Sequence, residues 1–94
     1  MTIRFSKETA EDLAAATEYL ADRNPRAAVE LVADILELVA RLDEGIFDGP
    51  EQKLRRGILV RSWPLPPYRI YYRRRGGVLE VMRVYHQARR PITR

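Results

Sequence analysis

The chain has 94 residues, which is enough for one hydrophobic core, so we expect residues 1–94 to form a single domain. It has no cysteine and one histidine, which excludes disulfides and zinc sites of the usual kinds, and we expect no metal and no cofactor. Its net charge is +4, no stretch approaches the roughly 20 apolar residues of a membrane span, and no signal peptide is recognisable, so we expect a cytoplasmic protein without a membrane partner.

The first residues predict a short strand and then a helix. Ile3 and Phe5 alternate with polar neighbours, as in a half-buried strand. Ser6 is suited to cap the following helix, because its hydroxyl can accept from the free amides of the first turn. The helix has one narrow apolar stripe, made of Ala10, Leu13, Ala16 and Leu20.

A second helix is predicted over about Pro25 to Asp43. Asn24 suits its N-cap, and Pro25 suits the first helical position, where a missing N–H costs nothing. Apolar residues recur at spacings of 4 and 3, with two leucines widening the stripe: Ala28, Val32, Ile35, Val39 and Leu42, with Leu31 and Leu38. So short a junction makes the two helices antiparallel, and both stripes need a sheet to cover.

The remainder predicts a loop and three strands. Residues 44–57 are polar and contain glycine, which indicates a loop. Strands are predicted at Ile58–Trp63, Tyr68–Arg74 and Val78–Tyr85, with an exposed turn at residues 64–67 and a glycine hairpin turn at 75–77. The expected fold is therefore α+β: an N-terminal strand, an antiparallel helical hairpin and a three-stranded antiparallel meander (β-α-α-β-β-β), with the helices on one face of the sheet.

The last predicted strand has apolar residues on both faces. Strict alternation puts one set on one face and the other set on the opposite face: Val78, Glu80, Met82 and Val84 against Leu79, Val81, Arg83 and Tyr85. The alternation does not decide which set faces the helices. We expect a central strand covered by the helices on one side and by a partner on the other.

Charge is divided unevenly along the chain. Residues 1–47 have five Lys or Arg against ten Asp or Glu, whereas residues 48–94 have twelve against three. Eleven of those twelve cations are arginines, which favours planar, bidentate recognition of carboxylates or phosphates. The basic half is suited to an acidic protein partner or to nucleic acid.

The stretch PPYRIYYRRRGGVLEVMRVYHQARRPI, at residues 66–92, resembles the C-terminal half of the RelE/ParE superfamily of type II toxins, and most closely its ParE branch. The short first strand, the helical hairpin with an Asn-Pro junction and the Tyr68-Arg69 pair extend the resemblance over nearly the whole chain. It implies a toxin held inactive in a hetero-oligomer with a cognate antitoxin. That antitoxin would have a DNA-binding N-terminal part and an acidic C-terminal segment that wraps over the toxin.

Members that resemble RelE cleave mRNA on the ribosome, which needs a proton acceptor, a proton donor and cations around one phosphate. Val60 and Ser62 lie near the positions where such members have lysines, and residues 87–94 contain no tyrosine or histidine. The resemblance to ParE implies instead a non-enzymatic poison of DNA gyrase. The alternative is a ribonuclease in which His86 or Tyr85 transfers protons while Arg69, Arg83 and Arg89 hold phosphate; a third class is a basic nucleic-acid-binding domain without toxicity.

Aromatic and arginine side chains of the basic half are the candidate contacts to an antitoxin or target: Trp63, Tyr68, Arg69, Tyr71, Arg73, Arg83, Tyr85, His86, Arg89 and Arg90. Structural roles compete with this assignment. Arg73 is placed to pair with Glu80 across the hairpin, His86 to bond a nearby carbonyl, and Trp63 to cover the sheet edge. No catalytic residue is assigned.

Overall fold

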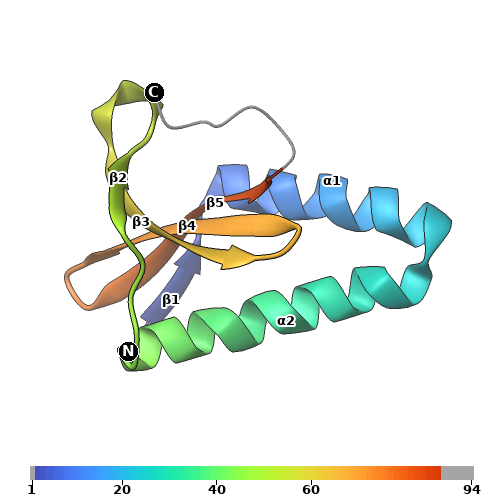
Figure 1. Ribbon diagram of the computed structural model, residues 1–94, viewed down its shortest axis with the longest axis horizontal. Coiled ribbons are helices and arrows are strands. Elements are labelled where there is room, and N and C mark those ends of the chain that lie inside the picture. The colour runs from blue at the N-terminus through green and yellow to red at the C-terminus, as the bar shows by residue number, and fades with distance from the viewer. Residues whose placement is uncertain (1, 88–94) are drawn as a thin grey trace.

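A computed structural model describes residues 2–87 and has the expected α+β architecture (Figure 1). Its elements are β1 (Thr2–Phe5), α1 (Lys7–Arg23), α2 (Pro25–Glu44), β2 (Glu51–Lys53), a 3₁₀ turn (Arg55–Gly57), β3 (Leu59–Leu65), β4 (Tyr68–Arg75) and β5 (Val78–His86). The sheet order is β1-β5-β4-β3-β2, with β1 parallel to β5 and the other neighbours antiparallel. Within residues 2–87 no helix is long and apolar enough to cross a membrane.

Local sequence signals set both helix junctions as predicted. The Ser6 hydroxyl accepts from the Thr9 N–H at 3.0 Å and caps α1. Asn24 ends α1 and starts α2, where its side chain accepts from the Ala27 N–H at 3.2 Å. Gly45 ends α2 with φ of 77°, a left-handed conformation that glycine adopts without steric cost.

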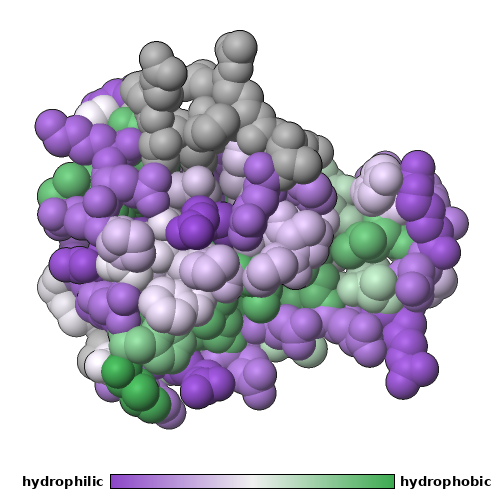
Figure 2. Space-filling view, in the orientation of Figure 1, coloured by the Kyte–Doolittle hydropathy of each residue, from purple (hydrophilic) through white to green (hydrophobic). Residues whose placement is uncertain are grey.

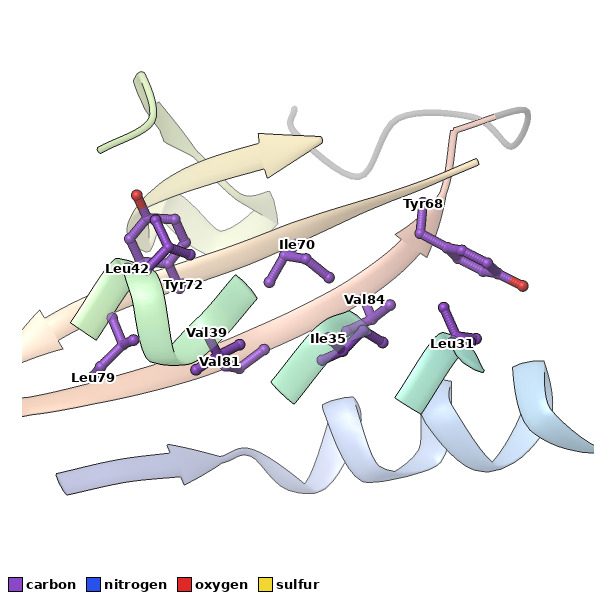
Figure 3. Close-up of a cluster of buried hydrophobic side chains, with 10 residues drawn as sticks. All are labelled: Leu31, Ile35, Val39, Leu42, Tyr68, Ile70, Tyr72, Leu79, Val81 and Val84. Carbon is purple, nitrogen blue, oxygen red and sulfur yellow. The ribbon is translucent and has the colours of Figure 1, made fainter. Parts of the chain in front are cut away.

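One main core lies between α2 and the sheet (Figure 3). Its buried members are Leu31, Ile35, Val39 and Leu42 from α2, with Tyr68, Ile70, Tyr72, Leu79, Val81 and Val84 from the sheet. From α1, Leu13, Ala16 and Leu20 pack on the same cluster, which places both helices on one side of the sheet. The expected stripes were wrong at Ala10 and Val32, which are exposed; Thr9 is fully buried instead and donates to the Val81 carbonyl.

A β-bulge breaks the alternation expected for β5. Tyr71 pairs with Arg83 and Tyr72 with Val81, so Met82 is an extra residue on the β5 side. Beyond the bulge, Val84 joins Leu79 and Val81 in the helix-covered core. The prediction that Val84 lies opposite Leu79 was therefore wrong, because strict alternation does not survive an inserted residue.

Two segments expected as turn or loop contribute to the sheet. Within the expected loop, β2 pairs with residues 59–61 of β3. Pro64 continues β3 instead of belonging to the turn, and it pairs with Arg69. The Ser62 N–H donates to Pro50 on the β2 side at 3.2 Å, so the Pro64 nitrogen, two residues on, points to the same side beyond the end of β2. No ladder hydrogen bond is lost there, which is why proline is tolerated.

Candidate partner-binding surfaces

The sheet divides seven of the ten candidate residues between its two faces. Three of them accompany the helix-covered core: Trp63, Tyr68 and its register partner His86. Four lie on the opposite face, which we call the open face: Arg69, Tyr71, Arg73 and Tyr85. Arg83 lies at the β5 edge, and Arg89 and Arg90 lie outside the described residues. The candidates thus do not form one patch.

A second, smaller hydrophobic cluster lies on the open face. Leu54, Val60 and Tyr71 are buried in it, and Ile58, Met82 and Tyr85 pack around them. Burial raises the pKa of Tyr71 above its ordinary value. The segment from Leu54 to Val60 therefore already covers part of the face for which the sequence predicted a partner.

An uncovered hollow of about 390 Å³ remains beside this cluster. Its apolar lining comes from Leu54, Ile58, Met82 and Tyr85, and its charged lining from Arg56, Arg83 and Glu8. Apolar walls with a few charged groups are typical of surfaces that bind a peptide side chain. In the orientation of Figure 2, strongly hydrophilic residues are abundant over the half of the molecule that contains the strands.

The open-face arginines have partners within the fold. Arg69 donates to the Ser62 hydroxyl at 2.8 Å, and that hydroxyl donates to Gln52 at 2.6 Å. Arg73 pairs with Glu80 at 3.1 Å, which confirms the cross-strand pair suggested by the sequence. These contacts hold both guanidinium groups in position on the open face, where Glu80 balances the charge of Arg73 and the Arg69 partner is a neutral hydroxyl.

Arg83 is fixed more firmly than the others. Its guanidinium donates from Nε at 2.8 Å and from an Nη atom at 2.9 Å to the two carboxylate oxygens of Asp12 on α1. Hydrogen bonding to this carboxylate raises the pKa of Arg83, against the opposing effect of burial. The bidentate pair positions Arg83 at the rim of the hollow.

The helix-covered candidates have contacts of a structural kind. Trp63 packs on Phe47 with ring centroids 4.5 Å apart, as a lid over one end of the core. The Tyr68 and His86 rings meet edge to face at 5.2 Å. They line a hollow of about 640 Å³ between the helices and the β3–β4 turn, which also has three acidic side chains around it: Asp12, Glu30 and Asp34. This hollow lacks the arginine rim of the open face.

A network around Asp48 was missed from the sequence. The Tyr72 hydroxyl donates to Asp48, the Gly49 N–H donates to that hydroxyl at 2.8 Å, and Arg74 binds both Asp48 oxygens at 2.9 Å. Burial and the hydrogen bond to Asp48 raise the pKa of Tyr72 to about 12. Burial alone would raise the pKa of Asp48, but the hydrogen bonds from Tyr72 and Arg74 lower it below its ordinary value.

This network anchors the chain between α2 and β2 to the sheet. Arg74 also donates to the Leu42 carbonyl at 2.6 Å, which caps the end of α2. Gly49 passes so close to β3 that an added Cβ would lie 1.7 Å from the Ser62 carbonyl oxygen. Tyr72 and Arg74 are more than 20 residues from Asp48 in sequence, and only the Asp-Gly dipeptide signalled a special backbone there.

Comparison with known proteins places this architecture in a family. A family model described as "ParE toxin of type II toxin-antitoxin system, parDE" matches residues 3–91. No curated protein matches the chain. A solved structure described as the chromosomal ParDE TA system from P. aeruginosa has a TM-score of 0.73 at 23% identity, covering 92% of this chain and 95% of that chain. The same strand, helical hairpin and antiparallel strands thus occur in both, and the chain belongs to the ParE toxin family of type II toxin–antitoxin systems.

Proposed function

We propose that the protein poisons DNA gyrase and blocks replication by binding, without catalysing a reaction. The observation that carries this proposal is that the two candidate proton-transfer groups of a ribonuclease, His86 and Tyr85, lie on opposite faces of the sheet. His86 lies with Tyr68 on the helix-covered side, whereas Arg69 and Tyr85 lie on the open face. RNA cleavage needs acid, base and cations around one phosphate, and this separation favours a binding surface instead.

The open face also supports an antitoxin partner. We propose that the acidic C-terminal segment of a cognate antitoxin places an apolar side chain in the hollow beside Met82, with its carboxylates near Arg56 and Arg83. The DNA-binding part of the antitoxin would lie outside this contact, and the hetero-oligomer would form in the cytoplasm. The basic charge of residues 48–94 supports this pairing.

Expression without antitoxin tests the target. We expect filamentation and DNA-damage signalling, and we expect His86→Ala to remain toxic, because a binding surface tolerates truncation outside its hot spots. Removal of a proton-transfer group would instead cost on the order of 10²- to 10⁴-fold in a catalysed step. Ribosome-dependent mRNA cleavage that disappears in His86→Ala would overturn the gyrase proposal in favour of the ribonuclease.

A charge reversal tests the antitoxin site. Arg56 is exposed at the hollow, so Arg56→Glu should weaken antitoxin binding about tenfold or more through repulsion of an acidic segment. Arg23→Glu is the matched control, because Arg23 is also exposed but lies at the end of α1. Equal antitoxin affinities of the two variants would show that the antitoxin does not bind at the open face.

A further inference from the structure

The side of α2 that faces away from the core has an apolar stripe of its own. It consists of Val29, Ala33, Leu36 and Ala40, which we call the outer stripe. All four are exposed, Val29 at 70% and Leu36 at 53%, and Val32 at 37% widens the stripe on one flank. Figure 1 shows α2 along the lower edge of the molecule, with the sheet above it. Among the described residues, nothing covers this stripe.

The spacing of the outer stripe is that of a coiled-coil seam. Its members are 4, 3 and 4 residues apart, the alternation that keeps apolar residues on one line of contact between two helices. The same register extends three residues in each direction, to Arg26 and to Asp43. A six-position seam therefore has a cation at its start, four apolar residues in the middle and an anion at its end.

This seam is complementary to itself when reversed. With the two-fold axis between residues 34 and 35, Val29 lies opposite Ala40 of a second copy, and Ala33 lies opposite Leu36, so each large side chain meets a small one. Arg26 then lies opposite Asp43 of the second copy. A parallel pairing would put Arg26 against Arg26 and Leu36 against Leu36, so sequence and charge select the antiparallel arrangement.

We propose that α2 binds a second copy of this chain, antiparallel and with two-fold symmetry, through the outer stripe. This contact between two copies is independent of the gyrase target. The open face lies on the other side of the sheet from α2, so a homodimer leaves the hollow beside Met82 accessible in each copy. A complex would then contain two toxin chains.

The flanking charges are compatible with this pairing. Arg26 bonds Glu30 at 3.5 Å, but their side chains are 87% and 62% exposed, so this ion pair is weak and Arg26 can turn to a new partner. Asp43 is half-buried at the other end of the seam, and a cation opposite its exposed part would compensate its charge. On one flank Glu30 approaches Glu37 of the second copy, and Arg41 of that copy lies at the same level and offsets the repulsion.

Sedimentation of the purified chain over a range of concentrations tests the association. We expect a monomer–dimer equilibrium whose dissociation constant rises about 30-fold or more in Leu36→Glu, which buries two carboxylates in the seam. Leu59→Glu is the matched control, because Leu59 is 49% exposed but lies on β3, and it should leave the equilibrium unchanged. Unfolding curves verify that both variants fold.

Cysteine cross-linking tests the orientation, since the chain has no cysteine of its own. Val29→Cys mixed with Ala40→Cys should give a disulfide-linked dimer on mild oxidation. Val29→Cys alone should not, because its two copies lie 11 residues apart along the helix axis, roughly 16 Å, which is beyond disulfide reach. A purely monomeric protein, cross-linking of Val29→Cys with itself, or loss of antitoxin binding in Leu36→Glu without any dimer would each overturn the proposal; the last would assign the stripe to the antitoxin.

Discussion

Asp12 on α1 binds both the Arg83 guanidinium and the Val84 backbone N–H on β5, the latter at 3.0 Å. Pairing between β1 and β5 ends where Phe5 meets Val81, so within residues 2–87 the later part of β5 has no neighbouring strand on that side. The first turns of α1 take its place: Ser6 and Thr9 donate hydrogen bonds to the carbonyls of Val81 and Met82, and Asp12 accepts from the Val84 N–H. The Asp12 carboxylate thus accepts the hydrogen bond that a neighbouring strand would otherwise accept from β5.

Removing that carboxylate should destabilise the fold. We expect Asp12→Ala to lower the free energy of unfolding by ~2 kcal/mol, because it leaves the partly buried Arg83 guanidinium and the Val84 N–H without their acceptor. Arg26→Ala, which removes an exposed ion pair, should cost less than about 0.5 kcal/mol in the monomer. Urea unfolding measures both. Equal effects would mean that the Asp12 contacts contribute little.

Gly49 is the second structural test. Gly49→Ala should lower the free energy of unfolding by about 3 kcal/mol or more, because the added Cβ would collide with the Ser62 carbonyl on β3. Gly45→Ala is the control: its φ is also unfavourable for alanine, but no atom lies within 4 Å of the new Cβ, so the cost should be about 1 kcal/mol. Thermal unfolding that ranks Gly45→Ala as the more damaging change would refute the close approach.

The raised pKa of Tyr72 makes the free energy of unfolding depend on pH in the alkaline range. Its folded pKa of about 12 exceeds the ordinary 10.0, so the fold stabilises the neutral phenol. That contribution is complete below pH 10 and is lost as pH rises towards 12, by on the order of 2–3 kcal/mol. Tyr72→Phe should be less stable at neutral pH, because Asp48 and Gly49 lose a partner, but should lose less stability over this pH range. Parallel alkaline profiles of the two proteins would contradict the pKa assignment.

Local signals predicted much of the fold, and long-range contacts explain most of what was missed. Ser6, Asn24 and Pro25 act on their own helix ends, so the sequence places those ends correctly. The short strand β2 and the bulge at Met82 depend on strands that lie elsewhere in the chain, and no local pattern announces them.

The candidate surfaces were predicted by residue type more than by position. Arg73 and Glu80 are directly opposed on neighbouring strands, so their pair follows from the hairpin alone. The partner of Arg83 is 71 residues away on another element, so the sequence suggested a free binding arginine where the structure has a tethered one. The same limitation hid Asp48, whose partners in β4 are reached only through the folded sheet.

The basic charge of residues 48–94 predicts a salt-dependent association with an acidic antitoxin. Raising ionic strength from about 50 to 500 mM shortens the Debye length severalfold, so the association rate should fall by about tenfold or more while the dissociation rate changes less. Stopped-flow mixing of toxin and antitoxin measures both. An association rate that is constant across this range would show that electrostatic attraction does not accelerate binding of the antitoxin.

The most direct measurement of the central claim is a supercoiling assay with purified gyrase, relaxed plasmid and ATP. The account predicts that the protein inhibits supercoiling, increases cleaved plasmid and loses both effects when antitoxin is added in stoichiometric amount, and that His86→Ala behaves as the wild type does. Unimpaired supercoiling, together with ribosome-dependent cutting of mRNA by the same preparation, would contradict it.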